Sequence, residues 1–324
     1  MRHLKPALAA MFLLFLVPLT ASAATPLVEL RVEGPTQTLD SGTWYVTGTE
    51  RIRKSKPADD CERTDGRIRI PGPTALGLVE TGAAFNSDLN QVRIRRDEAG
   101  IFVCEIGSIL GRSFSDPAGF AGWSYYSEYV FGSEAADLVD VGNGDKILWV
   151  FSDFGVSPAN TGSVLELKRV PARDADGEFE VRVVEHSFDG SANPAPGATI
   201  EGAGSVNELD NGLYRVTVDS GFTELRATRG LDVDSNHVET CFKQRISRCP
   251  RAHGRTIVGS DRADDLPGTR GFDTIKAGGG GDTIDLRKGG RDKVRCGSGN
   301  DLVLLDRGDR DDNIAANCER KRRS

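Results

Sequence analysis

Short runs in which apolar and polar residues alternate extend along most of the chain, and Gly, Asn, Asp or Pro residues separate them. A period of two places one face of a segment in a core and the other in solvent, which is typical of β-strands. Six runs before residue 164 therefore predict strands, at 28–34, 43–48, 91–96, 101–107, 136–142 and 146–154. The pair Asn143-Gly144, just before the last run, favours a tight hairpin turn.

Two further segments of this region, 75–84 and 105–111, predict short helices. Between residues 164 and 242 the spacing of the alternating runs becomes more regular. Strands are predicted here at 163–170, 177–186, 197–204, 212–218, 223–230 and 235–242. Regular short strands separated by turn residues are typical of a β-sandwich. The chain is therefore predicted to be mainly β, with a small α+β domain followed by a sandwich.

The last part of the chain carries an internal repeat. Aspartates recur after glycine-rich turns at steps of 9, 9, 10 and 9 residues, and each stands two residues before an apolar residue. They are Asp264, Asp273, Asp282, Asp292 and Asp301, and Asp312 continues the series more loosely. A period this short is typical of a solenoid, and two turns per coil would place alternate aspartates in two rows. We expect a short parallel β-roll here.

Glycine in such turns permits positive φ, so that backbone carbonyls can point into one cleft that the aspartate completes. A Ca²⁺ ion bound through oxygen at about 2.3–2.6 Å would span coils that are about 4.8 Å apart. We therefore predict calcium as the cofactor, with the turns of Asp282 and Asp301 as the best candidates. Besides the five aspartates of the regular repeat, the predicted metal residues are Gly271, Gly278, Gly280, Gly299 and Asn300.

The segments 277–285 (AGGGGDTID) and 296–304 (CGSGNDLVL) resemble the haemolysin-type, or RTX, calcium-binding nonapeptide repeat. The other repeats are degenerate, and arginines and Lys288 crowd the turns. An arginine could repel the metal or replace it by pairing with an aspartate. A metal-free roll that serves as a structural stalk or spacer is therefore the alternative.

Two other resemblances cover the rest of the chain. The segments 28–39 and 141–154, with the aromatic stretch 122–130 between them, look like the C-terminal β-domain of transcobalamin-type secreted proteins, which implies a fold and no ligand contact. The stretch 194–230 is similar to immunoglobulin-like and carboxypeptidase-regulatory-like modules. The resemblance implies a role as a spacer or in adhesion. The predicted organisation is a signal peptide at 1–23, the transcobalamin-like α+β domain at 24–163, the sandwich at 164–242, a linker at 243–254 and the roll with its basic tail at 255–324.

The N-terminus has the three parts of an export signal: basic residues, an apolar run and the small-residue cleavage pattern Ala21-Ser22-Ala23. We expect a secreted, extracellular protein without a transmembrane segment after cleavage, and leave open its retention at the cell surface. Six cysteines can then be oxidised. Local spacing favours the pairs Cys61–Cys104, Cys241–Cys249 and Cys296–Cys318.

Catalytic motifs are missing from the sequence: we find no HExxH, no G-x-S-x-G and no phosphate-binding GxxxxGK[ST]. The charge is uneven: the C-terminal region is basic, and the rest of the mature chain is acidic enough to give a net charge of −7. This acidic body argues against nucleic acid as a partner. We expect a non-enzymatic binding or adhesion protein whose partners are calcium and a cell-surface or extracellular macromolecule. A second alternative is capture of a small ligand by the aromatics Trp123, Tyr125, Tyr126 and Tyr129, although core packing explains these residues more simply.

Overall fold

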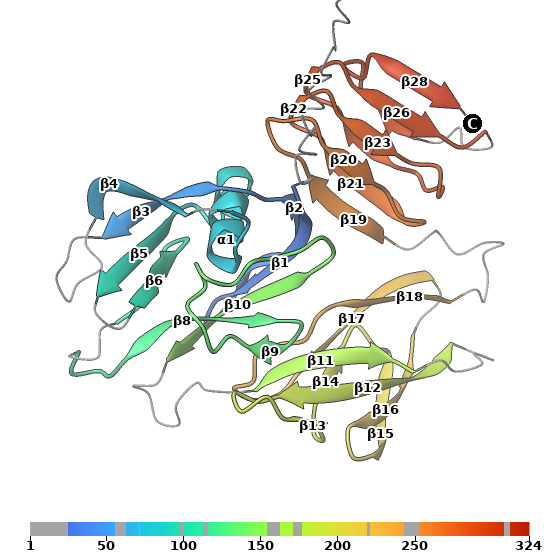
Figure 1. Ribbon diagram of the computed structural model, residues 1–324. Helices are drawn as coiled ribbons and strands as arrows, with labels where there is room; N and C mark the ends of the chain where they lie inside the picture. The colour runs from blue at the N-terminus through green and yellow to red at the C-terminus, as the bar shows by residue number, and fades with distance from the viewer. Residues whose placement is uncertain are drawn as a thin grey trace, which may run out of the picture.

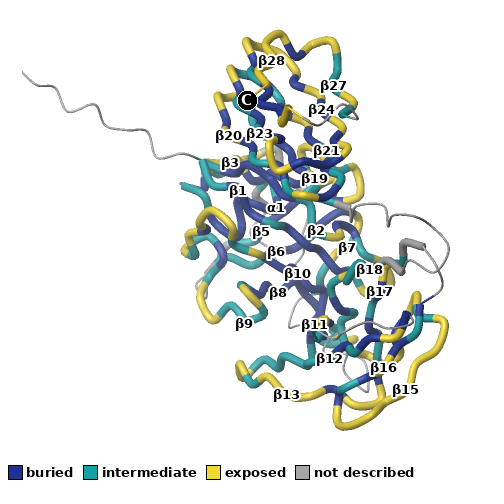
Figure 2. Tube along the Cα trace, turned by 90° about the vertical axis from the view of Figure 1, so that its right-hand side faces the viewer, coloured by how far each residue is buried: buried dark blue, intermediate teal, exposed yellow. Residues whose placement is uncertain are grey.

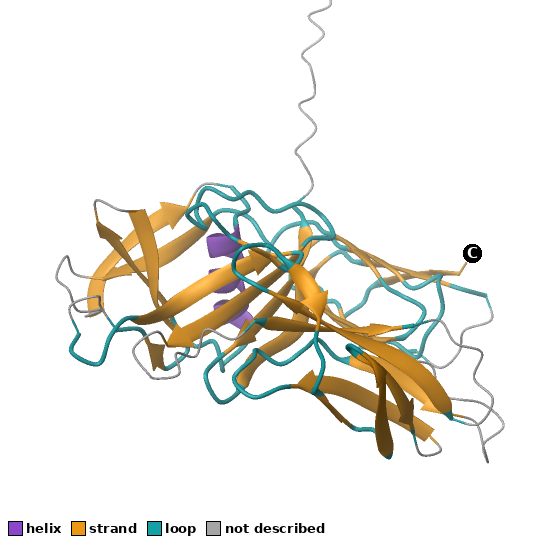
Figure 3. Cartoon of the chain, turned by 90° about the horizontal axis from the view of Figure 1, so that it is seen from below, coloured by secondary structure: helices purple, strands orange, loops and turns teal. Residues whose placement is uncertain are grey.

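The computed structural model of the chain consists mainly of strands and loops, and its strands form three groups, the first of which contains a short helix (Figures 1 and 3). It describes residues 25–55, 63–70, 72–97, 100–112, 116–153, 163–170, 177–218, 221–242, 253–307 and 312–323. The predicted fold class is confirmed: a mainly β chain with an α+β part, a β-sandwich and a short parallel β-roll. The domain boundaries and the signal peptide remain predictions.

The first group combines a helix with strands of two sheets, which enclose one core. The helix α1 (Ala75–Phe85) begins at Thr74, whose hydroxyl accepts a hydrogen bond from the Gly77 amide at 3.0 Å. It packs against strands of both sheets. One sheet contributes β1 (Leu27–Glu33), β2 (Thr38–Val46), β8 (Ala121–Ser127), β9 (Val130–Phe131) and β10 (Lys146–Asp153), and the other has the order β4 (Arg63–Ile70), β3 (Glu50–Ser55), β5 (Val92–Asp97), β6 (Gly100–Ile106) and β7 (Ile109–Leu110).

The second group is the β-sandwich, and its core lies between two antiparallel sheets. Alternate residues of β12 (Glu178–His186), among them Val181 and Val183, are fully buried, as the period of two predicts. The larger sheet contains β12, β11 (Val164–Arg169), β13 (Ala192–Pro194), β15 (Ser205–Asp210) and β16 (Leu213–Thr217). The smaller sheet has the order β14 (Thr199–Glu201), β17 (Gly221–Thr228) and β18 (Val238–Phe242). Figure 2 shows β13 and β15 as mostly exposed edges.

The third group is the parallel roll, in which successive coils stack strand upon strand. Its apolar residues Ile275, Ile284, Val294 and Val303 point inward and are at most 1% exposed. One face consists of β19 (His253–Val258), β21 (Phe272–Lys276), β24 (Lys293–Arg295) and β27 (Asn313–Ile314). The opposite face consists of β20 (Asp265–Pro267), β23 (Thr283–Asp285), β26 (Leu302–Leu305) and β28 (Arg320–Arg323), and the short strands β22 (Gly279–Gly280) and β25 (Ser298–Gly299) pair in the turns between them.

The roll and the first group share one sheet, which the sequence did not predict. Strand β19 pairs in parallel with β2, so that Ile257 lies beside Trp44 and the sheet runs through nine strands (Figure 1). Trp44 is 6% exposed and belongs to the apolar cluster of the roll, together with Leu27 and Val46. The guanidinium of Arg255 lies 3.7 Å from the centre of the Trp44 ring. The first coil therefore uses side chains of the first group to close its core.

Two predicted elements are wrong. Residues 105–111 form the end of β6, a turn and β7, because Ile106 and Ile109 pair across that turn in a hairpin. Residues 136–142 form turns and a single bridge, so the turn at Asn143-Gly144 does not join two strands of a hairpin. Instead the Asn143 side chain accepts a hydrogen bond from the Leu27 amide at 3.1 Å, and β10 pairs in parallel with β1.

The aromatic cluster belongs mainly to the core. Trp123, Tyr125 and Tyr126 are 8%, 6% and 1% exposed, and the Tyr125 hydroxyl donates to the Glu134 carbonyl at 2.8 Å. Burial of these rings supports core packing and argues against an exposed platform. Tyr129 is different, because it is only partly buried and lies at the boundary with the sandwich.

Of the three predicted disulfides, Cys296–Cys318 is present. Cys104 is also disulfide-bonded, but its predicted partner Cys61 lies outside the described residues. The same holds for Cys249, and hence for the predicted pair Cys241–Cys249. Among the described residues, no helix has the length and apolar character that a membrane crossing requires.

Replacing Trp44 with alanine should destabilise the protein by about 3–5 kcal/mol and loosen the roll in particular, since Trp44 fills its core. Guanidinium denaturation measures the total loss, and amide hydrogen exchange in β21 and β24 reports on the roll. Trp123→Ala is the matched control, because Trp123 is similarly buried in the other core. Equal exchange of the roll amides in both variants would contradict a shared core.

Candidate metal centre

The repeated aspartates lie at the points where the turns of the roll enter its strands. Each of the five in the regular repeat is at most 6% exposed, although aspartate is usually a surface residue. The strand pairing places Asp264, Asp282 and Asp301 along one side of the roll. It places Asp273 and Asp292 along the other side, with Asp312 next in line. Both rows agree with the sequence prediction.

Within each row, carboxylates bind the backbone of the preceding coil. Asp282 Oδ1 accepts a hydrogen bond from the Asp264 amide at 3.0 Å, and Asp301 Oδ1 accepts one from the Asp282 amide at 2.9 Å. Glu319 ends this row, since its Oε2 accepts from the Asp301 amide at 3.0 Å. These amides are buried and need a partner, so the aspartates have a structural role without any metal.

The second row repeats the same arrangement. Asp292 Oδ1 accepts from the Asp273 amide at 2.9 Å, and Asp312 Oδ1 accepts from the Asp292 amide at 3.0 Å. At the start of this row Asp273 Oδ1 accepts from the Arg255 amide at 2.6 Å. The direction is therefore constant along the roll: each carboxylate reaches back by one coil.

The first aspartate of each row has no oxygen to spare, because a hydroxyl residue four positions earlier caps its turn. Asp264 Oδ2 accepts from the amide and the hydroxyl of Ser260, at 2.6 and 2.9 Å. Asp273 Oδ2 accepts from the Thr269 amide at 2.6 Å, and its Oδ1 accepts from the Thr269 hydroxyl at 2.9 Å. These two turns are closed by hydrogen bonds alone.

The next two turns of the first row have glycine in place of a capping hydroxyl. Gly278, Gly280 and Gly299 take φ values of +102°, +108° and +141°, which other residues rarely adopt. A Cβ at Gly299 would overlap the carbonyl oxygen of Gly280 in the coil before. Here Oδ2 of both Asp282 and Asp301 is buried and has no hydrogen-bond partner.

The electrostatics of this row are unfavourable to a bare carboxylate. Burial raises the pKa of Asp282 to about 6, and the neighbouring carboxylates Asp264 and Asp301 add to the rise, while the hydrogen bond from the Asp264 amide opposes it. Burial also raises the pKa of Asp264. Arg287, one of the arginines near the turns, pairs with Asp285 at 2.7 Å on the surface, outside the row.

The remaining predicted metal residues occupy different positions. The Gly271 amide donates to the Thr269 hydroxyl at 3.0 Å, in a turn that is already capped. Asn300 is exposed, and the Arg320 guanidinium donates to its backbone carbonyl at 3.4 Å. Among the described residues, no three His, Cys, Asp or Glu side chains converge as a metal cluster. A cation between Asp282 and Asp301 would therefore need backbone carbonyl oxygens as well as the two carboxylates.

Sequence reasoning missed three residues of this region: Ser260, Thr269 and Glu319. Ser260 and Thr269 stand four residues before their aspartates, and Glu319 stands 18 residues after Asp301. Those spacings were the available signal. Comparisons with protein-family models, with curated proteins and with solved structures gave no significant match.

Without divalent cations, we expect the protein to become less stable as the pH rises from about 5 to about 7. Asp282 loses its proton near pH 6 when folded and near its ordinary value of 3.8 when unfolded. The folded state therefore holds this proton more tightly, and the stability it contributes is complete below pH 3.8 and lost as the pH rises through 6.

Thermal denaturation in a chelator at both pH values measures this effect. Asp282→Asn should remove part of the pH dependence, whereas Asp273→Asn should leave that part intact. An unchanged pH dependence in Asp282→Asn would be inconsistent with a strained carboxylate row.

Proposed function

We propose that the protein is an exported binding protein without enzymatic activity, and that Ca²⁺ orders its roll between the turns of Asp282 and Asp301. The observation that carries this proposal is the pair of buried Oδ2 atoms without hydrogen-bond partners. A buried carboxylate oxygen without a partner is costly. Because these oxygens are hard, negatively charged ligands, a hard divalent cation suits them best.

The charge along the row supports the same proposal. Asp264, Asp282 and Asp301 stand in successive coils, and their mutual repulsion contributes to the raised pKa of Asp282. A divalent cation between two of them would replace that repulsion with attraction. Arg287, an arginine near these turns, does not neutralise the row, because it pairs with Asp285.

The turn backbone could supply the other ligands. Calcium takes about 6–8 oxygens and accepts backbone carbonyls readily. The turns around Gly278, Gly280 and Gly299 combine positive φ with close approach between coils, as the Gly280 carbonyl beside Gly299 illustrates. The capped turns of Asp264 and Asp273 offer no comparable position. In the second row, Asp292 and Asp312 have further interactions of their own, so we propose one site at Asp282 and Asp301 rather than a ladder of ions.

A metal-free stalk or spacer is the second candidate, and a specific observation favours it. The inter-coil hydrogen bonds of both rows, together with the caps from Ser260 and Thr269, hold the roll without a metal. In either case the immunoglobulin-like part would act as a spacer or an adhesion module, and the partner would be a cell-surface or extracellular macromolecule.

Calcium titration of the whole protein separates the two candidates. Calorimetry and the melting temperature should both respond to Ca²⁺ and much less to Mg²⁺, which keeps its water more firmly. The whole chain is required, because Leu27, Trp44 and Val46 complete the core of the roll. If Ca²⁺ produces neither binding heat nor a shift in melting temperature, the calcium site is refuted and the metal-free stalk is the remaining candidate.

Asp282→Asn and Asp301→Asn should weaken calcium binding at least tenfold, since each removes a charged ligand. The amide oxygen can still accept the inter-coil hydrogen bond, so both variants should fold. Asp273→Asn is the matched control: it lowers stability in the other row while calcium affinity stays unchanged. Equal loss of affinity in all three variants would contradict a site confined to Asp282 and Asp301.

A further inference from the structure

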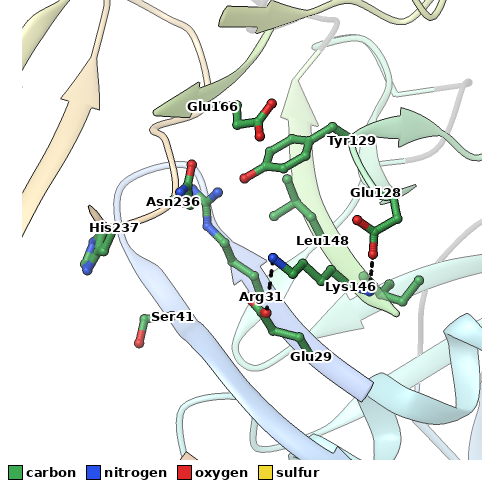
Figure 4. Close-up of a pocket in the computed structure, with 11 residues that line it drawn as sticks. Glu29, Arg31, Ser41, Glu128, Tyr129, Lys146, Leu148, Glu166, Asn236 and His237 are labelled. Carbon is green, nitrogen blue, oxygen red and sulfur yellow. Dashed lines mark hydrogen bonds and ion pairs between the residues drawn. The ribbon is translucent and has the colours of Figure 1, made fainter. Parts of the chain in front are cut away.

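A cavity of about 310 Å³ lies between the first group of strands and the sandwich (Figure 4). Strands β1 and β10 form its floor, the β8–β9 hairpin and Glu166 of β11 form one wall, and Asn236 and His237 approach from the sandwich. Its volume is at the small end of the range for ligand pockets. It is separate from the roll turns discussed above.

Arg31 lines this cavity and is held rigidly. Its side chain is 8% exposed, its Nε donates to Glu33 at 2.7 Å, and its Nη2 donates to the backbone carbonyl of Asp234. The third nitrogen, Nη1, is buried and has no hydrogen-bond partner. Two partners fix the guanidinium, and the remaining donor has no hydrogen bond that an anionic group would have to displace.

The hairpin turn between β8 and β9 is strained. Glu128 and Tyr129 have φ values of +48° and +66°, a conformation that costs a non-glycine residue about 1–3 kcal/mol. The Tyr129 ring stacks on His186 of the sandwich, with 4.8 Å between ring centres. In Figure 4 its hydroxyl points toward Arg31. The strained turn therefore places a second hydrogen-bonding group beside Arg31, at the end of the cavity that could bind an anion.

The opposite end of the cavity is acidic and incompletely neutralised. Burial raises the pKa of Glu29, and its nearest cation, Lys146 Nζ, is 3.9 Å away, too far for a hydrogen bond. The Glu128 carboxylate accepts a hydrogen bond from the backbone amide of Lys146 at 2.9 Å. Because the amide is neutral, this contact does not balance the charge of Glu128. Glu166 lies beside Tyr129 rather than at this end (Figure 4), and Lys168 and His186 bind it at 2.8 and 2.9 Å.

We propose that this cavity binds a free amino acid or a zwitterion of that size. Its carboxylate would meet Arg31 and Tyr129, and its ammonium group would lie toward Glu29 and Glu128. A ligand with both charges and no net charge satisfies both ends, whereas a simple anion would face the acidic residues unpaired. The volume accommodates a single amino acid.

The test uses the purified protein and the common L-amino acids, each added alone, with the melting temperature and calorimetry as readouts. At least one amino acid should raise the melting temperature. Acetate and ethylamine, which carry one charge each, should raise it less. An equal effect of acetate would overturn the assignment of a zwitterion, and no effect of any amino acid would overturn the site.

Two variants examine the lining residues without disturbing the buried contacts of Arg31. Tyr129→Phe retains the ring on His186 and should weaken binding about tenfold, through loss of a hydrogen bond to a charged group. Lys146→Met removes the cation that lies 3.9 Å from Glu29 and should strengthen binding of the ligand's ammonium end. Tyr125→Phe and Lys321→Met are the matched controls, because both side chains lie outside the cavity. Unchanged affinity in both Tyr129→Phe and Lys146→Met would overturn the proposed pose.

Discussion

The hydrogen bond from the amide at the start of one coil to a carboxylate in the next holds the roll in register. It explains why a carboxylate recurs every second turn: each stacked strand leaves a buried N–H that needs an acceptor, and Asp282 and Asp301 provide it. The same bond uses only one of the two oxygens. What happens to the second oxygen depends on the turn, since Ser260 occupies it in the capped turn and glycine leaves it without a partner.

This division gives the two ends of the roll different characters. The turns of the first coil are closed by hydroxyl caps, and this coil is joined to the first group because β19 pairs with β2. The later coils contain the glycine turns and depend on the first coil for their core, which Trp44 helps to fill. Calcium binding in the later coils would therefore be coupled to the folding of the whole molecule rather than of a detachable tail.

Alternation of apolar and polar residues was sufficient to predict most strands and both rows of aspartates, because the period of two and the repeat of nine follow directly from strand geometry. It failed at 105–111 and 136–142, where pairing across a turn and a parallel contact between β1 and β10 decide the structure. The inter-coil hydrogen bonds were not predictable either, since a buried aspartate that binds an amide and one that binds a metal have the same spacing. Only the neighbouring residues, Ser260 or glycine, distinguish them.

The last strand of the roll, β28, consists of Arg320, Lys321, Arg322 and Arg323, all exposed. Strand β28 lies at the edge of its sheet, and an edge strand offers open backbone groups to any other strand that approaches. A second molecule that presented the same edge would bring four further cations against these four, so pairing of two molecules through this edge is discouraged by repulsion. The four basic side chains therefore disfavour pairing between two copies of this edge.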